Sequence, residues 1–283
     1  MLMHTPTRPA AVPDFVRAVG GVRVLLGRTP RGTAPLEIGE SGGFRVRFPR
    51  ASSPDEGGSP CEGVLINTGG GLTGGDRVST EATLTPGARG VLTTQAAEKV
   101  YRSDGPDAEA TVALTLGPES RLDWLPQETI LFDGARLRRR LRAEMAGDAT
   151  LLLVESTVLG RAATGETVES GSFRDRWRIR RDGRLVFAEE VRLEGPIAAA
   201  LARPAVAKGS RAVATCLLVA PDAEARLEEA RAALEGGRSE CGVSAYDGML
   251  VARFLSPEPK SLRADLIRYT ETLRGPLPRS WQT

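Results

Sequence analysis

The sequence has 283 residues, with 38 lysines and arginines against 36 aspartates and glutamates, so the formal net charge is only +2. Acids and bases are interspersed rather than gathered into a basic face, which argues against a nucleic-acid-binding protein. The 32 glycines and 19 prolines exceed average usage and favour turns and short strands over a helix-rich fold.

Cysteine and histidine usage restricts both the compartment and the chemistry. Cys61, Cys216 and Cys241 are far apart and odd in number, so neither a disulfide framework nor a Cys-x-x-Cys metal site is expected. We expect a cytoplasmic protein, since we find no signal peptide and no stretch approaching the ~18 apolar residues of a membrane span. The single histidine, His4, lies in the N-terminal tail, so we expect neither a Ser-His-Asp triad nor a metal site built from several imidazoles.

Short strands dominate the predicted elements. Residues 1–16 are predicted to be a disordered tail, followed by a single domain over 17–283. Strands are predicted from alternating or continuous apolar runs in Arg17–Leu26, Phe44–Phe48, Val64–Ile66, Val78–Leu84, Val91–Thr94, Ala110–Leu116, Leu137–Met145, Leu151–Val154 and Gly248–Phe254. The glycine- and proline-rich stretch between the first two is predicted to form turns, and Arg50–Pro60 an exposed loop.

The second half of the chain adds a hairpin and two helices. Asp182-Gly183 between Phe173–Ile179 and Leu185–Leu193 predicts a β-hairpin. Only two segments predict helices: Ala223–Leu234, capped by Asp222, and Ser261–Leu273, with Leu262, Leu266, Tyr269 and Leu273 on one face. This order predicts a mainly β protein with two helices near its C-terminus and argues against a doubly wound sheet.

The most distinctive stretch is the glycine loop, Asn67–Asp76. Gly69, Gly71 and Gly74 fit the G-x-G-x-x-G spacing of a dinucleotide-binding turn, but a strand pattern follows them instead of a helix. Nucleotide binding is therefore rejected. The five glycines predict a tight strand-to-strand connection with positive φ angles or close backbone approach: Gly69, Gly70, Gly71, Gly74 and Gly75.

Carboxylates beside glycines, prolines and turns are the remaining candidates for chemistry: Asp76, Glu98, Glu128, Asp133 and Glu166. Two of them could act as the acid pair of a β-rich carbohydrate-active enzyme, or several could meet a divalent cation weakly through oxygen. Glu98–Arg102 combines an acid, a base and a phenol, although a solvated helical turn explains it as well. Arg138–Arg140 indicates a charged outer strand face or a protein contact rather than phosphate binding.

Taken together, these segments resemble the urease accessory protein UreD family, called UreH in some bacteria. The resemblance extends from about Gly20 to the C-terminus and rests on these stretches: Asn67–Asp76, Thr93–Ser103, Trp124–Ala135, Gly160-Arg161 with Gly165-Glu166, Asp175–Trp177 and Leu277–Trp281.

The resemblance implies a β-helix-like stack of many short strands with two helices and no catalysis of its own. It also implies a scaffold that joins the accessory proteins UreF and UreG to the urease apoprotein, with nickel in transit and no tightly bound cofactor. Scattered oxygen ligands suit transit because they release a metal readily. We therefore predict that the five carboxylates mark a polar interior or its mouth, with polar support from Lys99, Tyr101, Arg102 and Arg161. The two helices are expected to pack on the core, with UreF contact as the alternative.

Overall fold

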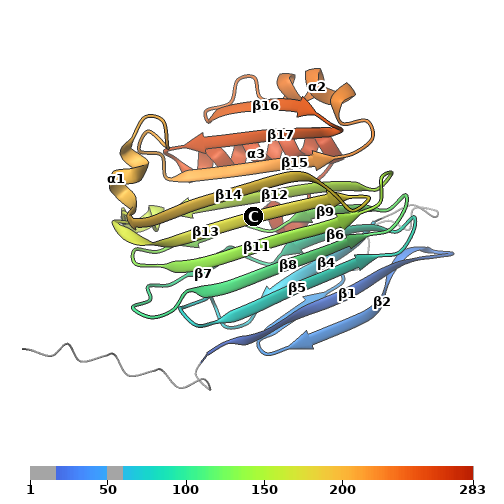
Figure 1. Ribbon diagram of the computed structural model, residues 1–283, viewed down its shortest axis with the longest axis horizontal. Coiled ribbons are helices and arrows are strands. Elements are labelled where there is room, and N and C mark those ends of the chain that lie inside the picture. Colours follow the sequence, from blue (N-terminus) through green and yellow to red (C-terminus); the bar gives the residue numbers. More distant parts are fainter. Residues whose placement is uncertain (1–16, 50–59, 283) are drawn as a thin grey trace, which may run out of the picture.

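The computed structural model describes residues 17–49 and 60–282, so the predicted tail over 1–16 and nearly all of the predicted loop lie outside the described residues. Two β-sheets face each other (Figure 1). The seven-stranded sheet contains, in spatial order, β14 (Arg184–Pro196), β13 (Ser170–Arg181), β11 (Arg136–Met145), β8 (Ala108–Leu116), β5 (Arg77–Leu84), β1 (Val19–Thr29) and β2 (Gly32–Ser41).

The ten-stranded sheet is the second layer. In spatial order it contains β16 (Glu240–Tyr246), β17 (Met249–Ser256), β15 (Ala212–Val219), β12 (Thr150–Leu159), β9 (Arg121–Leu125), β6 (Arg89–Thr94), β4 (Cys61–Asn67) and β3 (Phe44–Arg47). Two short strands, β7 (Glu98–Val100) and β10 (Thr129–Leu131), pair with each other in parallel, and β10 also pairs with the end of β12. The predicted mainly β fold is confirmed.

The chain alternates between the two sheets and so builds a β-helix-like stack. From β4 to β13 each pass crosses from one sheet to the other, and strands of successive passes pair in parallel. The short strands β7 and β10 form a narrow third side, which Leu72 of the glycine loop extends through a parallel bridge to Val100. The glycine loop therefore belongs to the stack, at one end of the strands.

Two hydrophobic cores hold the layers together. Inward-facing residues of both sheets, such as Val24, Leu141 and Leu153, fill the space between the sheets. The opposite face of the ten-stranded sheet forms a second core with the two helices that lie nearest the C-terminus. Strand β12 contributes to both cores, which explains why the run Leu151–Leu159 is buried at every position.

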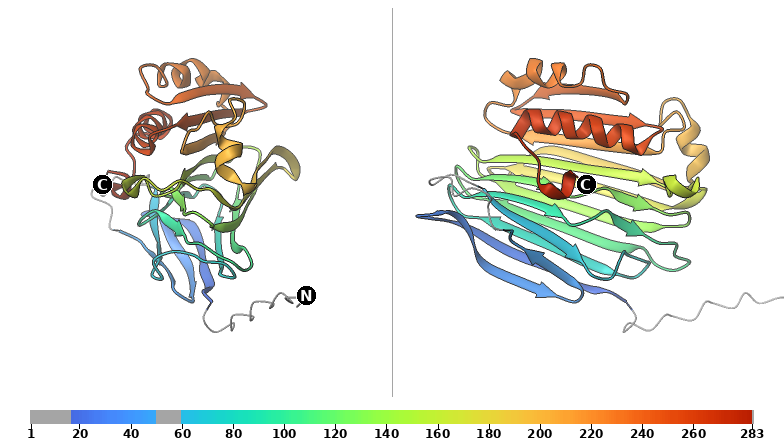
Figure 2. Two further views of the ribbon diagram at one scale, coloured as in Figure 1. Left: turned by 90° about the vertical axis from the view of Figure 1, so that its left-hand side faces the viewer. Right: turned by 180° about the vertical axis from the view of Figure 1, so that it is seen from behind.

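Two helices, α2 (Leu227–Ala232) and α3 (Pro259–Arg274), pack on the outer face of the ten-stranded sheet, as the view from behind shows (Figure 2). A third helix, α1 (Ile197–Ala202), follows β14 and contributes Ile197 and Leu201 to the core between the sheets. Short 3-10 turns lie at Ala162–Thr164, Glu224–Arg226 and Arg279–Trp281. The prediction of α3 is confirmed, and its apolar face, formed by Leu262, Leu266, Tyr269 and Leu273, packs in the second core.

Several local predictions are wrong. The segment between the first two predicted strands is β2, a strand at the sheet edge, where a proline such as Pro35 is tolerated. Glu98 begins strand β7 rather than a helical turn. Asp222 does not cap the first predicted helix, which is divided into a 3-10 turn and α2, and α1 follows Pro196 without having been predicted.

The hairpin at Asp182-Gly183 is confirmed. Strands β13 and β14 pair in antiparallel fashion, and the two turn residues have φ angles of 50° and 75°. Positive φ at both positions is what a type I′ turn requires.

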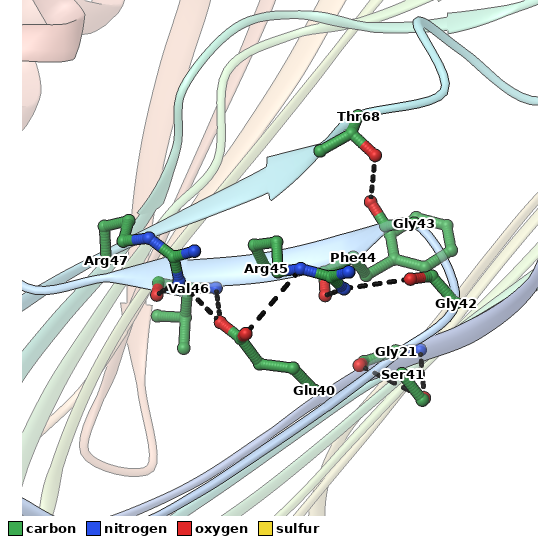
Figure 3. Close-up of polar contacts among 10 residues, drawn as sticks. All are labelled: Gly21, Glu40, Ser41, Gly42, Gly43, Phe44, Arg45, Val46, Arg47 and Thr68. Atoms are coloured by element: carbon green, nitrogen blue, oxygen red, sulfur yellow. Dashed lines mark hydrogen bonds and ion pairs between the residues drawn. The ribbon is translucent and has the colours of Figure 1, made fainter.

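Glu40 ties the two sheets together at the start of the stack (Figure 3). Its side chain reaches from β2 to β3. One carboxylate oxygen accepts hydrogen bonds from the Val46 amide, at 2.7 Å, and from the Arg47 guanidinium, at 2.8 Å. These bonds, the Val46 amide first, lower the pKa of Glu40. Because the Val46 amide would otherwise face outward from an edge strand, Glu40 protects that edge from pairing.

Candidate functional site

The glycine loop docks on β7 as an additional piece of strand. The Leu72 amide donates to the Lys99 carbonyl at 2.7 Å, and the Tyr101 amide donates to the Leu72 carbonyl at 2.8 Å. The Tyr101 hydroxyl also donates to the Gly70 carbonyl at 3.0 Å. The loop connects β4 to β5, so the predicted strand-to-strand connection is confirmed. Both the amide and the carbonyl of Leu72 are hydrogen-bonded to the neighbouring backbone.

Two of the loop glycines are required by close backbone approach. A Cβ at Gly74 would lie 1.8 Å from Ser103 Oγ and 2.3 Å from the Pro106 carbonyl oxygen. A Cβ at Gly71, which has a φ of +150°, would lie 2.6 Å from Tyr101 Cε2 and 2.7 Å from the Lys99 carbonyl oxygen. The glycines therefore let neighbouring segments touch the loop, rather than cradle a phosphate.

Replacing Gly71 by alanine is expected to lower the free energy of unfolding by about 1–3 kcal/mol, because the new methyl group collides with backbone as well as side chain. Urea unfolding followed by circular dichroism measures the change. The matched control is Gly242→Ala in β16, where an added Cβ meets no atom within 4 Å. Equal stability of the two variants would contradict this account of the loop.

Asn67 links the loop to Glu98. Its Oδ1 accepts a hydrogen bond from the Gly69 amide at 2.9 Å, and its Nδ2 donates to both carboxylate oxygens of Glu98, at 3.1 and 3.2 Å. Burial raises the pKa of Glu98 to about 7, the Asn67 hydrogen bonds oppose the rise, and the charge of Asp76 adds to it. Glu98 is thus a carboxyl group that changes charge near neutral pH.

Glu98 is expected to make the folded protein less stable as the pH rises from 5 to 8. Its pKa is higher in the folded state, so the folded protein binds more protons between the unfolded and folded pKa values, and stability falls across that window. The Glu98→Gln variant should lack this contribution, which we put at about 1–2 kcal/mol after allowing for partial solvent exposure. Thermal unfolding at pH 5 and pH 8 tests it, and parallel pH profiles of the two proteins would refute it.

Glu98 lies at one side of a cavity of about 330 Å³ between the two sheets. Apolar side chains such as Val22, Leu65 and Leu137 form much of its wall. Its polar lining comes from Asn67, Ser79, Thr80, Thr94, Gln95, Glu98, Lys99, Gln127, Thr129, Arg139 and Glu155. Exposed residues of the glycine loop and of the segment before β7 belong to the lining, so the cavity reaches the surface there.

A buried ionic network forms part of the lining. Arg139 donates one guanidinium nitrogen to Glu155 and to Thr129 Oγ1, the latter at 3.1 Å, and the other to Asp175 at 2.6 Å. The indole nitrogens of Trp124 and Trp177 donate to Glu155 and Asp175, at 3.0 and 3.1 Å.

The prediction of an outer charged face for Arg138–Arg140 is wrong for its middle residue. Arg139 has the same parity along β11 as Leu137 and Leu141, both buried, so its side chain points inward. Burial raises the pKa of Glu155 despite the neighbouring guanidinium. Two acidic residues surround one guanidinium, so the network brings little surplus positive charge to the cavity.

Sequence reasoning did not select Glu155 or Asp175 as site residues, although a signal existed. Each occupies an inward position in an otherwise apolar strand pattern, as Arg139 does. Charged residues at inward positions of three separate strands, with opposite signs, predict a buried network.

The other four predicted carboxylates are engaged elsewhere. Asp76 accepts hydrogen bonds from the amides of Ala18 at 2.9 Å and Thr73 at 2.7 Å, and it is 4% exposed. Glu128 accepts a hydrogen bond from Arg263 of α3 at 3.0 Å.

Asp133 and Glu166 lie together, away from the cavity lining. Asp133 accepts from the amides of Glu169 and Ser170, at 2.8 and 3.1 Å. Glu166 forms an ion pair with Arg161 at 2.8 Å, which lowers the pKa of Glu166, and the Asp133 amide lowers it further.

The structure brings the five carboxylates together only in part. The Glu98 amide donates to the Glu128 carbonyl at 2.9 Å, so these two residues are neighbours in the backbone. Within residues 17–49 and 60–282, no three histidine, cysteine, aspartate or glutamate side chains are grouped closely enough to hold a metal ion.

Of the four predicted supporting residues, Lys99, Tyr101 and Arg102 bond to the glycine loop, whereas Arg161 contacts Phe132 and Glu166 instead. Lys99 lines the cavity, and its backbone carbonyl holds Leu72. The ring of Tyr101 packs edge-on against Phe132, with centroids 5.1 Å apart, and the Arg161 guanidinium lies 4.7 Å over the same ring. The Arg102 carbonyl accepts a hydrogen bond from the Thr73 hydroxyl at 3.2 Å.

The C-terminal segment is hydrogen-bonded to the end of β9 and to the chain between β9 and β10, beside the cavity. Gln127, which lines the cavity, donates to the Ser280 carbonyl at 3.0 Å. The Trp281 indole is buried and donates to the Leu125 carbonyl at 3.0 Å. Arg263 donates to both Glu128 and the Trp281 carbonyl, so α3, the C-terminal segment and the turn before β10 are joined.

Three of the stretches that carried the resemblance, Asn67–Asp76, Thr93–Ser103 and Trp124–Ala135, contribute residues to the lining of one cavity in a stacked β protein. A family model described as "UreD urease accessory protein" matches residues 18–282. The chain therefore belongs to the UreD family of urease accessory proteins.

Individual relatives agree with the family model along almost the whole chain. The chain is 50% identical to the urease accessory protein UreD of Methylobacterium sp. (strain 4-46), over 99% of this chain and 98% of that protein. It is 47% identical to the UreD protein of Azorhizobium caulinodans, over 96% of this chain and 99% of that protein. It is 50% identical to the UreD protein of Bradyrhizobium diazoefficiens, over 94% of each.

In the part of the chain that the structure describes, no helix is both long and apolar enough to cross a lipid bilayer. The longest, α3, has polar and charged residues along the side away from the second core.

Proposed function

We propose that this chain is a non-catalytic accessory protein of urease maturation, which joins UreF and UreG to the urease apoprotein and lets nickel pass through its interior. Membership of the UreD family supports the accessory role. The observation that supports passage is the cavity between the sheets, with the carboxyl group of Glu98 in its lining.

Of the five predicted carboxylates, we assign contact with nickel to Glu98. The carboxylates of Asp76, Asp133 and Glu166 already accept hydrogen bonds from backbone amides or arginine. Among the described residues, the carboxylate of Glu98 accepts hydrogen bonds from the neutral amide of Asn67 alone, and it lines the cavity. A single carboxylate with a neutral partner binds a divalent cation weakly, as release to the next site requires.

The alternative of a carbohydrate-active enzyme finds no support in the contacts of Glu128 and Asp133, the two acids that would be its first candidates. Glu128 is bonded to Arg263, and Asp133 is bonded to the amides of Glu169 and Ser170. A glycosidase needs two carboxyl groups that face one substrate site.

The accessory role is tested by expressing the urease subunits and the other accessory proteins with and without this chain. We expect the purified urease to contain nickel and hydrolyse urea only when the chain is present. We also expect UreF, UreG and urease apoprotein to co-purify with it. Fully nickel-loaded urease from cells that lack the chain would overturn the proposal.

A further inference from the structure

The outer face of the seven-stranded sheet carries rows of arginines across β11, β13 and β14. Register partners place Arg138 beside Arg174 and Arg174 beside Arg192. The next two rows pair Arg140 with Arg176 and Arg142 with Arg178. We call this set the arginine face: Arg138, Arg140, Arg142, Arg174, Arg176, Arg178, Arg180 and Arg192.

Acidic residues neutralise only part of the arginine face. Glu190 lies 2.6 Å from Arg174 and 3.4 Å from Arg176, and Glu194 lies 2.6 Å from Arg192. Arg138 and Arg180 pair with acids at the margin of the face.

The centre of the face has no ion pair within the described residues, although the charge of Glu190 also acts on Arg178. Within the described residues, Arg140 and Arg142 form no ion pair or side-chain hydrogen bond, and Arg178 donates only to the carbonyls of Trp177 and Glu189. Neighbouring strands lie about 4.8 Å apart, so these rows bring like charges close together. Like charges opposite each other destabilise a sheet by about 0.2–1 kcal/mol per pair. Stability of the isolated chain therefore does not explain the arrangement.

We propose that the arginine face is a docking surface for an acidic surface of a partner protein. Guanidinium groups suit this role because they bind carboxylates through two parallel hydrogen bonds and lose less hydration than ammonium groups. A row of carboxylates on the partner would relieve the repulsion within the face and pair with Arg140, Arg142 and Arg178 at once.

Protein fits this face better than nucleic acid does. Among the described residues, the exposed large aromatic side chains are Tyr101 and Tyr246. Both lie outside β11, β13 and β14, so these strands offer no exposed ring on which bases could stack. The net charge of the whole chain is only +2.

The test measures binding of the full chain to a labelled peptide of alternating glutamate and serine, and to a single-stranded oligonucleotide of equal charge, by fluorescence anisotropy at low and physiological salt. The test variant is Arg140→Glu with Arg142→Glu. The matched control is Arg28→Glu with Arg31→Glu, two exposed arginines near the β1–β2 turn, which changes the net charge equally.

We expect the test variant to bind the peptide at least about tenfold more weakly than the unmodified chain, and the control less than about twofold more weakly. Equal weakening by both variants would overturn the proposal, because the face would then act only through net charge. Tighter binding of the oligonucleotide than of the peptide would also overturn it, in favour of nucleic acid.

Folding of the test variant provides an independent check. A glutamate at position 140 lies beside Arg176, so the melting temperature should stay equal or rise. Arg140→Gln with Arg142→Gln removes the charges without reversing them and should show an intermediate loss of peptide binding. Undiminished binding by this second variant would contradict the assignment.

Discussion

The Arg139→Ala variant is expected to lose about 3–5 kcal/mol of unfolding free energy. Its guanidinium lies between Glu155 and Asp175, which are both at most 6% exposed. Removal of the guanidinium would leave two buried carboxyl groups without their cation. Urea unfolding at pH 7 measures the loss.

The neighbouring residue supplies the control for this prediction. Arg140 points outward from the same strand and makes no ion pair within the described residues, so Arg140→Ala should change the unfolding free energy by no more than about 0.5 kcal/mol. Similar losses in the two variants would show that the buried network contributes nothing specific.

The second large effect concerns the C-terminal segment. Replacing Trp281 by alanine is expected to cost about 3–5 kcal/mol, because its ring is 2% exposed in the second core and its indole hydrogen bond to Leu125 is lost. Thermal unfolding of the variant measures the cost. Gln282→Ala changes the exposed next residue and should leave the melting temperature unaltered. An unaltered melting temperature for the tryptophan variant would contradict the packing of this segment.

Periodicity was sufficient to predict most strands and α3. The alternation in Val78–Leu84 and Ala110–Leu116 follows directly from one buried and one outward face. The same rule separated the glycine loop from a nucleotide-binding turn, because a strand and not a helix follows Asp76.

Pairing could not be predicted in the same way. Parallel neighbours such as β5 and β8 are usually joined through a helix, whereas here each connection passes through the opposite sheet. Strand β2 escaped prediction because it lies at an edge, where Leu36 and Ile38 are exposed and the alternation of burial is lost.

The candidate site was only partly accessible from the sequence. The position of Glu98 beside a glycine loop suggested chemistry, but its cavity depends on Asn67, Gln127 and Arg139, which come from separate passes of the stack. Asp76 looked equally reactive, yet its oxygens are occupied by the Ala18 and Thr73 amides. Local sequence patterns identify acidic residues in turns. Contacts between distant parts of the chain decide which of these carboxylates already accept hydrogen bonds from backbone amides.

The central claim is that nickel reaches urease through the cavity beside Glu98. The most direct measurement is the nickel content of urease matured with the Glu98→Lys variant, which places a positive charge in the cavity lining. Glu37→Lys on the exposed edge strand β2 is the control with the same change of charge. We predict that both variants co-purify with UreF, UreG and urease apoprotein, and that only Glu98→Lys lowers the nickel content, by about tenfold. Equal nickel content in the two preparations would contradict passage through the cavity and leave the chain a scaffold alone.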